Sequence, residues 1–318
     1  MNRVRILFLL LLLQLVVAVA LKSRGDSLAA FVSGQPFFVG SHDQVKRITV
    51  ADGEGRSLLL VRNSSSWVLP ELNDFPASSR HIGELFEKLR VHRPYPIAST
   101  IAAASRLHVA DNTFDRRFTF HRGEGDAVLY LGAAPTFRRV YARLGGEQEI
   151  YEIPFDLFEY PTIPDEWYDT ELLKIHERSI RQVKTPSVTL LRREQGSGGY
   201  ALEELPLGRQ IIFTAASDFF RLIAELSFVG IVESPTDPVQ DAYLVEVTLD
   251  DDTVRTYRFA PLETGNYSLE ASGFDHVFEV LPTTVEALQS YTVATLTEPA
   301  EQAPSEATDS AQVQEATE

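Results

Sequence analysis

The chain has 318 residues, a formal net charge of −16 at pH 7 and a hydrophobic fraction of 44%, so its middle can bury real cores. A surface this negative repels nucleic acid and anionic lipid head groups, which excludes nucleic-acid binding as the main role. The complete lack of cysteine excludes disulfides, thiolate catalysis, Cys-ligated metals and an acylated-cysteine lipid anchor.

The first predicted element is a signal peptide or membrane anchor over residues 1–24. Ile6 to Leu21 are almost entirely apolar and follow the positive charges of Arg3 and Arg5. As a helix this segment would span about 24 Å, short of a ~30 Å hydrocarbon core, and Ala18-Val19-Ala20 fits a signal-peptidase site. These features favour a cleaved signal, whereas the leucine-rich composition and the basic residues that follow favour a retained anchor.

Both interpretations carry the bulk of the chain across a membrane. A retained leader predicts a single-pass protein of the cell inner (cytoplasmic) membrane, with its bulk facing the periplasm or the outside. A cleaved leader predicts secretion into the periplasm. The membrane, contacted through the N-terminal helix, is therefore the first expected partner.

Two stretches in the middle of the chain repeat one pattern, which predicts an internal duplication. Val45–Ile48 resembles Ile180–Val183, and each is followed by a second apolar run, a polar turn and an aromatic residue, Trp67 or Tyr200. Each copy therefore begins with short strands joined by turns.

An amphipathic helix follows in each copy. Ser78 or Ser79 is the candidate N-cap of the first helix, and the second is expected to begin after Thr214 to Ser217. Apolar residues at i, i+3, i+4 and i+7 predict one buried stripe on each helix. They are Ile82, Leu85, Phe86 and Leu89 in the first copy, and Phe219, Leu222, Ile223 and Leu226 in the second.

The second half of each copy predicts two β-hairpins, because alternating apolar runs flank turn-rich segments. A short, helical piece is expected at the end of each copy, near 155–160 and 284–290. The predicted strands are 117–121, 127–132, 140–144 and 149–153 in the first copy, and 243–249, 254–259, 267–271 and 276–280 in the second.

The predicted fold is α+β: two tandem related units of antiparallel strands packed with short helices, after an N-terminal hydrophobic helix. The first unit is placed at 43–170 and the second at 178–293. The pattern lacks long βαβ crossovers, so no parallel nucleotide-binding sheet is expected. Residues 297–318 are acidic and rich in Ala, Ser, Thr, Gln and Pro, which predicts a disordered acidic tail.

The order and spacing of these patterns resemble the DUF4340 family, a bacterial domain of unknown function. The resemblance runs from Lys46 to about Leu226, and Val140-Tyr141-Ala142-Arg143 is similar to the family's Tyr-x-Arg strand. It implies membrane anchoring by one N-terminal helix and an auxiliary role in ABC-type export systems, and it assigns no catalytic residues. Glu270 stands where the first copy has Arg143.

No catalytic, cofactor-binding or metal-binding residue is predicted. The seven histidines form no zinc-binding pair motif, and no phosphate loop is present, so any ATPase would lie on a partner chain. Asp250-Asp251-Asp252 lacks the spaced ligands of an EF-hand and is interpreted as a hairpin turn.

A few other side chains carry structural expectations. His81 lies off the apolar stripe of its helix, which predicts a solvated surface position. Arg143 is expected to pair with a buried carboxylate. Three aromatic residues are expected in the core, with partner anchoring as the alternative: Trp67, Trp167 and Tyr168.

The predicted function is therefore a membrane-anchored or exported non-catalytic domain, an auxiliary or scaffold component of an ABC-type transport complex. ABC transporter subunits are its candidate partners, and no cofactor is expected. The alternative is an extracytoplasmic hydrolase, or a protein that binds a small ligand or glycan, with its site between the two units.

Overall fold

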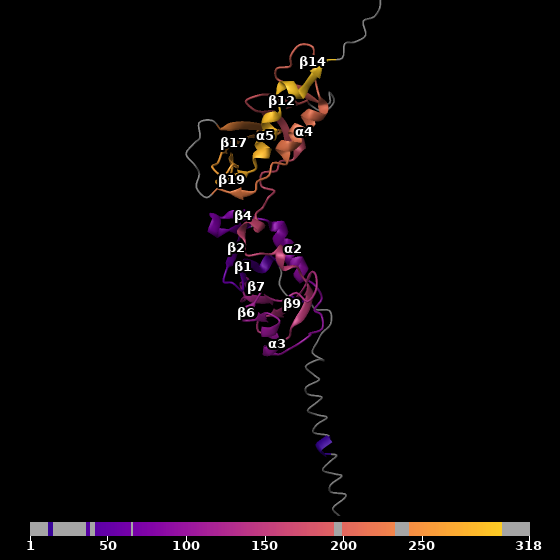
Figure 1. Ribbon diagram of the computed structural model, residues 1–318, viewed down its shortest axis with the longest axis vertical. Coiled ribbons are helices and arrows are strands. Elements are labelled where there is room, and N and C mark those ends of the chain that lie inside the picture. Colours follow the sequence, from indigo (N-terminus) through magenta and orange to yellow (C-terminus); the bar gives the residue numbers. More distant parts are fainter. Residues whose placement is uncertain are drawn as a thin grey trace, which may run out of the picture. The chain divides into compact units, whose positions relative to one another are not determined.

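The computed structural model of the chain describes residues 12–14, 36–38, 42–64, 66–193, 199–232 and 242–300 (Figure 1). The chain divides into two compact units, Met1–Asp169 and Thr170–Glu318. Of the predicted leader, only Leu12 to Gln14 lie within the described residues, where they are helical. No helix in the described ranges is both long enough and apolar enough to cross a membrane.

Unit 1 is built on an eight-stranded sheet in which all neighbouring strands are antiparallel. Its order is β10-β9-β8-β7-β1-β2-β3-β4. The strands are β1 (Val45–Asp52), β2 (Ser57–Asn63), β3 (Ser66–Leu69), β4 (Phe75–Ala77), β7 (Arg116–Arg122), β8 (Ala127–Leu131), β9 (Arg139–Leu144) and β10 (Tyr151–Pro154).

Successive side chains along a strand point to opposite faces of the sheet, and in unit 1 one of these faces is buried. Val50 of β1 lies opposite Leu58 on one side and Phe118 on the other, and all three are buried. Helix α2 (Ser79–Leu89) contributes its predicted stripe to the core, since all four apolar residues of that stripe are buried. The predicted cap is also confirmed, because Ser78 Oγ accepts the His81 N–H at 3.2 Å.

Unit 2 carries a second eight-stranded antiparallel sheet, in the order β13-β12-β11-β16-β17-β18-β19-β15. Helices α4 (Phe213–Ala224), α5 (Pro282–Ser290) and α6 (Val293–Leu296) accompany it, and β14 (Arg209–Ile211) pairs with β20 (Thr297–Pro299). The strands of the main sheet are β11 (Ile180–Lys184), β12 (Thr189–Arg192), β13 (Tyr200–Leu202), β15 (Gly230–Ile231), β16 (Tyr243–Leu249), β17 (Val254–Pro261), β18 (Tyr267–Ala271) and β19 (Val277–Val280).

The two sheets share one topology over seven strands. The order β10-β9-β8-β7-β1-β2-β3 in unit 1 matches β19-β18-β17-β16-β11-β12-β13 in unit 2, with α2 and α4 at the same point in the chain. The described chain therefore consists of two antiparallel sheet units with short helices. The sheets differ at their edges, where unit 1 adds β4 next to β3 and unit 2 adds β15 next to β19.

Several boundaries differ from the sequence-based ones. Helix α4 begins at Phe213 with Ile212 as its N-cap residue, rather than after Thr214 to Ser217. Thr297–Pro299 form β20, so ordered chain reaches into the predicted tail, whose residues from 301 onward lie outside the described ranges.

A helix–hairpin insertion in unit 1 was not predicted. It comprises α3 (Ile101–Arg106), β5 (Val109–Ala110) and β6 (Thr113–Phe114). A six-residue helix is too short to be stable alone, so its formation depends on packing. Ala103 and Ala104 pack in a small core with Tyr130 and Ile150.

We expect Gly132→Ala to destabilise unit 1 by about 3 kcal/mol, because overpacking against the backbone forces the chain to move. A Cβ at Gly132 would lie 2.1 Å from the Leu107 carbonyl oxygen and 2.3 Å from that of His108. Urea unfolding of the full chain measures the effect. Gly123→Ala is the matched control, since no atom lies within 4 Å of its new Cβ. Equal losses in both variants would contradict this packing.

Asp52, at the end of β1, organises the following turn from a buried position. Its Oδ1 accepts the N–H groups of Glu54 and Arg56 at 3.0 Å, and its Oδ2 accepts Arg56 Nε at 2.7 Å and the Thr162 hydroxyl at 2.9 Å. Burial alone would raise the pKa of Asp52, but the hydrogen bonds from Arg56, Thr162 and the backbone outweigh it and lower that pKa to about 2.

Because the folded pKa of Asp52 lies below the unfolded value of about 3.9, its ionised form stabilises the fold above about pH 4. That contribution is lost as pH falls through about 2. We expect Asp52→Asn to cost about 2 kcal/mol at pH 7, with the gap to wild type closing below pH 4. Denaturant titrations from pH 7 to pH 2 measure this, and exposed Glu54→Gln should change stability by under about 0.5 kcal/mol. A gap that is constant with pH would refute the assignment.

Candidate functional site

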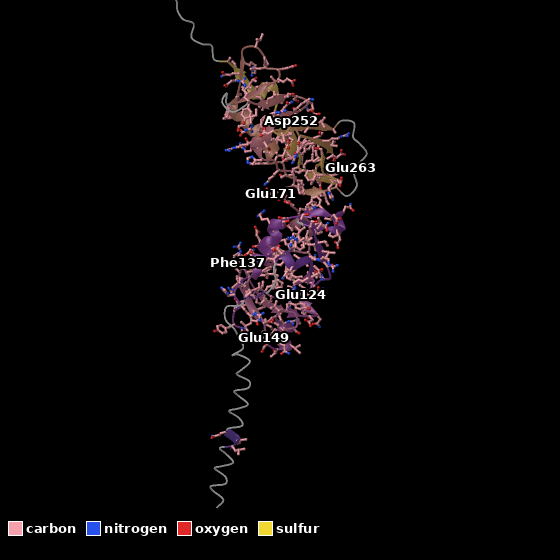
Figure 2. The ribbon with its side chains drawn as sticks, turned by 180° about the vertical axis from the view of Figure 1, so that it is seen from behind. Glu124, Phe137, Glu149, Glu171, Asp252 and Glu263 are labelled. Carbon is pink, nitrogen blue, oxygen red and sulfur yellow. The ribbon has the colours of Figure 1, made fainter. Side chains whose placement is uncertain are left out.

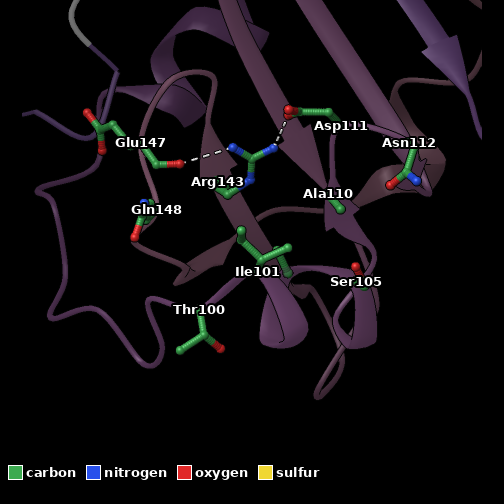
Figure 3. A pocket seen from close by; sticks show the side chains of 10 residues that line it. Thr100, Ile101, Ser105, Ala110, Asp111, Asn112, Arg143, Glu147 and Gln148 are labelled. Carbon is green, nitrogen blue, oxygen red and sulfur yellow. Dashed lines mark hydrogen bonds and ion pairs between the residues drawn. The ribbon is translucent and has the colours of Figure 1, made fainter.

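The guanidinium of Arg143 lies at the centre of a polar site in unit 1 (Figure 3). Its Nε donates to the Val109 carbonyl at 2.6 Å, and Nη1 donates to the Glu147 carbonyl at 3.0 Å. Nη2 forms an ion pair with Asp111 Oδ1, and the guanidinium stacks over the Tyr130 ring at 4.6 Å. Each of the three guanidinium nitrogen atoms therefore has a partner within the protein, and only 7% of Arg143 is exposed.

Local sequence explains why these groups converge. Strand β9 ends in a Gly145-Gly146 turn, where Gly146 adopts a positive φ of 83° and a Cβ at Gly145 would lie 2.8 Å from Val128 Cβ. This tight turn returns the Glu147 carbonyl to the guanidinium. The β5–β6 hairpin presents Asp111 from the opposite side, as Figure 3 shows.

Two cavities lie at this site, with volumes of about 420 Å³ and about 480 Å³, and Arg143 lines the first of them. Asp111 and Glu147 line both of them. The first is completed by α3 and the hairpin, including Ile101 and Asn112, and the second by residues that include Arg93. Both volumes are in the range that holds a small molecule or a few side chains.

The electrostatics of the site favour a ligand that donates hydrogen bonds. Three of the five N–H donors of Arg143 are engaged inside the protein, and its charge is paired with Asp111. The hydrogen bond from Arg143 lowers the pKa of Asp111, which keeps that exposed carboxylate ionised at neutral pH.

Glu147 has one carboxylate oxygen that is buried without a hydrogen-bond donor among the described residues. Its Oε1 accepts Arg93 Nη2 at 3.2 Å, whereas its buried Oε2 has no hydrogen-bond partner among the described residues. A buried acceptor without a donor costs free energy, so a donor arriving in the cavity would be stabilised. The arrangement therefore suits an ammonium, guanidinium, amide or hydroxyl group.

The described part of the chain contains no group of three or more His, Asp or Glu side chains that could hold a metal ion. Two carboxylates, Asp111 and Glu147, lie beside an immobilised cation at this site. Tyr130, whose pKa is raised by burial and by Asp111, stays protonated beneath the guanidinium.

The structure corrects part of the Arg143 prediction. The arginine does pair with a carboxylate, but it is the guanidinium that is buried, while the Asp111 side chain is 79% exposed. Asp111, Glu147 and Arg93 were missed. Asp111 lies in the unpredicted hairpin, Glu147 meets Arg143 only through the turn after β9, and Arg93 reaches Glu147 from the segment after α2. The glycine pair after β9 was the one local signal that the chain returns at this point.

The prediction that His81 is a solvated surface residue is wrong. Its ring stacks on Tyr160 at 4.8 Å and meets Trp167 edge-on at 5.0 Å, and its Nε2 is buried without a partner in the described residues. Burial lowers the pKa of His81, partly opposed by Glu84. The segment after β10 folds back over α2, which the periodicity of one helix cannot reveal.

Other sequence-based expectations are confirmed. Trp67, Trp167 and Tyr168 are buried, and the Trp167 indole N–H donates to the Pro161 carbonyl at 2.9 Å. The Asp250–Asp252 segment forms the turn between β16 and β17.

Comparison with known families gives one match. The profile of a family described as a domain of unknown function (DUF4340) matches residues 67–251. This span runs from β3 to the turn after β16 and includes the whole Arg143 site. No curated protein and no solved structure matches the chain.

Arg143→Lys should destabilise unit 1 by about 2–3 kcal/mol, because one ammonium group cannot reach two carbonyls and a carboxylate at once. Hydrogen–deuterium exchange should accelerate first in α3 and the β5–β6 hairpin. Arg138→Lys is the matched control, since Arg138 is exposed and its ion pair with Asp156 is 3.8 Å long. Unchanged exchange in the hairpin would show that the guanidinium does not hold it.

Proposed function

The chain belongs to the DUF4340 family, and from that premise we propose that it is a non-catalytic, membrane-anchored binding component of an ABC-type transport complex. In this proposal the N-terminal segment holds the protein at the cell inner membrane, with both units on the outer side. The Arg143 site recognises a segment of a transporter subunit.

The leader and the family support the membrane and transport parts of the proposal. Ile6 to Leu21 are apolar and preceded by Arg3 and Arg5, which is the pattern of an exported or anchored chain. The family resemblance implies an auxiliary role beside an ABC ATPase and permease.

The single observation that carries the binding part is the buried, unpaired acceptor in the Arg143 site, Glu147 Oε2, beside cavities that the ionised Asp111 also lines. Apolar side chains lie close by along one segment: Ile101 lines the cavity, and Tyr95 and Ile97 are also exposed. Ile97 N–H bonds to the Ile150 carbonyl at 2.8 Å, which fixes this segment beside the β9–β10 turn. A cationic or amide side chain flanked by apolar residues fits such a surface.

We expect the full chain, tagged and purified from solubilised membranes of its native host, to recover an ABC permease and ATPase identified by mass spectrometry. Asp111→Asn combined with Glu147→Gln should reduce that recovery at least tenfold, because both carboxylates lose their charge while their shapes are kept. Recovery should also fall as salt rises.

Exposed Glu203→Gln combined with Glu263→Gln removes the same charge from unit 2 and should leave recovery unchanged. Purification of the chain without any transporter subunit would refute the transport role. Equal recovery by both double variants would refute the role of the Arg143 site.

A second candidate function is an extracytoplasmic hydrolase or a protein that binds a small ligand or glycan. The observation that favours small-ligand binding is the hydroxyl and amide lining of the smaller cavity, which suits a hydroxyl-rich molecule. These groups belong to Thr100, Ser105, Asn112 and Gln148. A thermal-shift screen against glycans distinguishes it: a saturable shift that Asn112→Ala abolishes would favour this candidate over the transport role.

A further inference from the structure

The outer edge of the sheet is covered in unit 2. Strand β15 pairs antiparallel with β19, with Gly230 opposite Glu279 and Ile231 opposite Phe278. The Val229 N–H donates to the Glu279 carbonyl and the Val232 N–H donates to the Val277 carbonyl, both at 2.8 Å. A short apolar segment thus satisfies the outward backbone groups of the last strand.

The equivalent edge of unit 1 is covered only at its beginning. Strand β10 occupies the place of β19. Glu152 precedes Ile153, which pairs with Val140 of β9, and Glu279 precedes Val280, which pairs with Tyr267 at the matching place of β18. Glu152 therefore corresponds to Glu279. Ile97 and Ala98 exchange backbone hydrogen bonds with Ile150 at 2.8 and 2.7 Å. Beyond Ile150, no strand of the described residues pairs with the outer side of β10.

The backbone of Glu152 faces this open side. The Tyr141 N–H donates to the Ala133 carbonyl, and the Tyr141 carbonyl accepts the Gly132 N–H. Both backbone groups of Tyr141 therefore point to the β8 side. Along a strand of an antiparallel sheet, the backbone groups of successive residues point to alternate sides, so the residues next to Tyr141 bond to β10. Their partners Tyr151 and Ile153 bond back to β9, and the backbone N–H and carbonyl of Glu152 point outward. The Arg139 guanidinium reaches the Glu152 carbonyl at 3.4 Å, where unit 2 has the β15 backbone.

Two exposed phenylalanines lie in the loops at the C-terminal end of β10. Phe137 precedes β9 and Phe158 follows β10, and they are 83% and 93% exposed. The Phe155 N–H donates to the Arg138 carbonyl at 3.1 Å, which places the two loops side by side. Figure 2 shows Phe137 on the outside of unit 1. Exposed aromatic side chains at an open strand edge are typical of an interaction surface.

The charges at this edge suit an apolar occupant. Glu152 forms an ion pair with Arg139, and Arg138 is opposite Asp156, so each carboxylate has a cation beside it. A segment carrying charge would gain little here, whereas an apolar one would cover both phenylalanines.

We propose that the β10 edge of unit 1 is a docking site for an extended, apolar segment of a partner protein. The segment adds to β10 as an antiparallel strand, as β15 adds to β19. Its backbone bonds the Glu152 N–H and carbonyl, and its side chains cover Phe137 and Phe158. This surface uses residues other than those of the Arg143 site, so it goes beyond the proposed function.

A peptide with the sequence of residues 227–232, Ser-Phe-Val-Gly-Ile-Val, capped at both ends, is the probe, because it contains the strand that covers this position in unit 2. Hydrogen–deuterium exchange of the full chain in detergent is measured with and without the peptide. We expect exchange at Glu152 to slow at least fivefold and saturably.

Glu152→Pro should weaken peptide binding at least tenfold, because proline lacks the outward N–H while the β9 ladder does not use it. Phe137→Ser combined with Phe158→Ser should weaken peptide binding at least tenfold. Leu207→Ser, at a fully exposed leucine in unit 2, is the control and should bind the peptide like wild type.

Absence of protection at Glu152 in the wild-type chain at saturating peptide, or peptide binding that neither variant weakens, would overturn the proposal. Protection at Glu152 that grows with chain concentration in the absence of peptide would show that a second copy occupies the edge. That result would also overturn the assignment to a partner protein.

Discussion

The long-range pairing of each unit's first strand with the strand that returns after the helix closes the fold. In unit 1, β1 pairs with its hairpin partner β2 on one side and with β7 on the other, and in unit 2 β11 lies between β12 and β16 in the same way. The chain between the paired strands includes the amphipathic helix, which must then lie over one face of the sheet. Burial of the helix stripe against that face gives each unit its core, and the remaining hairpins extend the sheet outward.

In unit 1 the Arg143 site lies on β9, one of the strands that extend the sheet outward from β7. Strand β9 carries the arginine into a space enclosed by an insertion that unit 2 lacks in its described residues. At the matching position unit 2 has Glu270, which lies on β18 beside Arg258 of β17. The two units therefore share the sheet but not the buried cation. The energetic reason is that a buried guanidinium needs several acceptors, and among the described residues only unit 1 has the β5–β6 hairpin, which supplies the Val109 carbonyl and the Asp111 carboxylate.

Prediction from the sequence worked where local patterns and burial agree. The hairpin strands alternate apolar and polar residues and flank turn residues, so β16 and β18 have the predicted bounds. Ser78 and the stripe of α2 were found because capping and periodicity are local. The start of α4 was misplaced because Ile212, its N-cap residue, provides no side-chain capping signal. His81 was misplaced because Tyr160 and Trp167 reach it from a distant segment.

The sequence alone determined the α+β class and the repeated order of strands and helix, since both follow from periodicity, turn residues and spacing along the chain. Its resemblance to DUF4340 also identified the family. Only the tertiary structure decided which side chains meet: that Asp111 and Glu147 flank Arg143, that His81 is enclosed, and that the β10 edge is less covered than the β19 edge. These contacts join segments whose separation along the chain is bridged by packing. No local pattern encodes the partner of a buried charge or the covering of an edge strand.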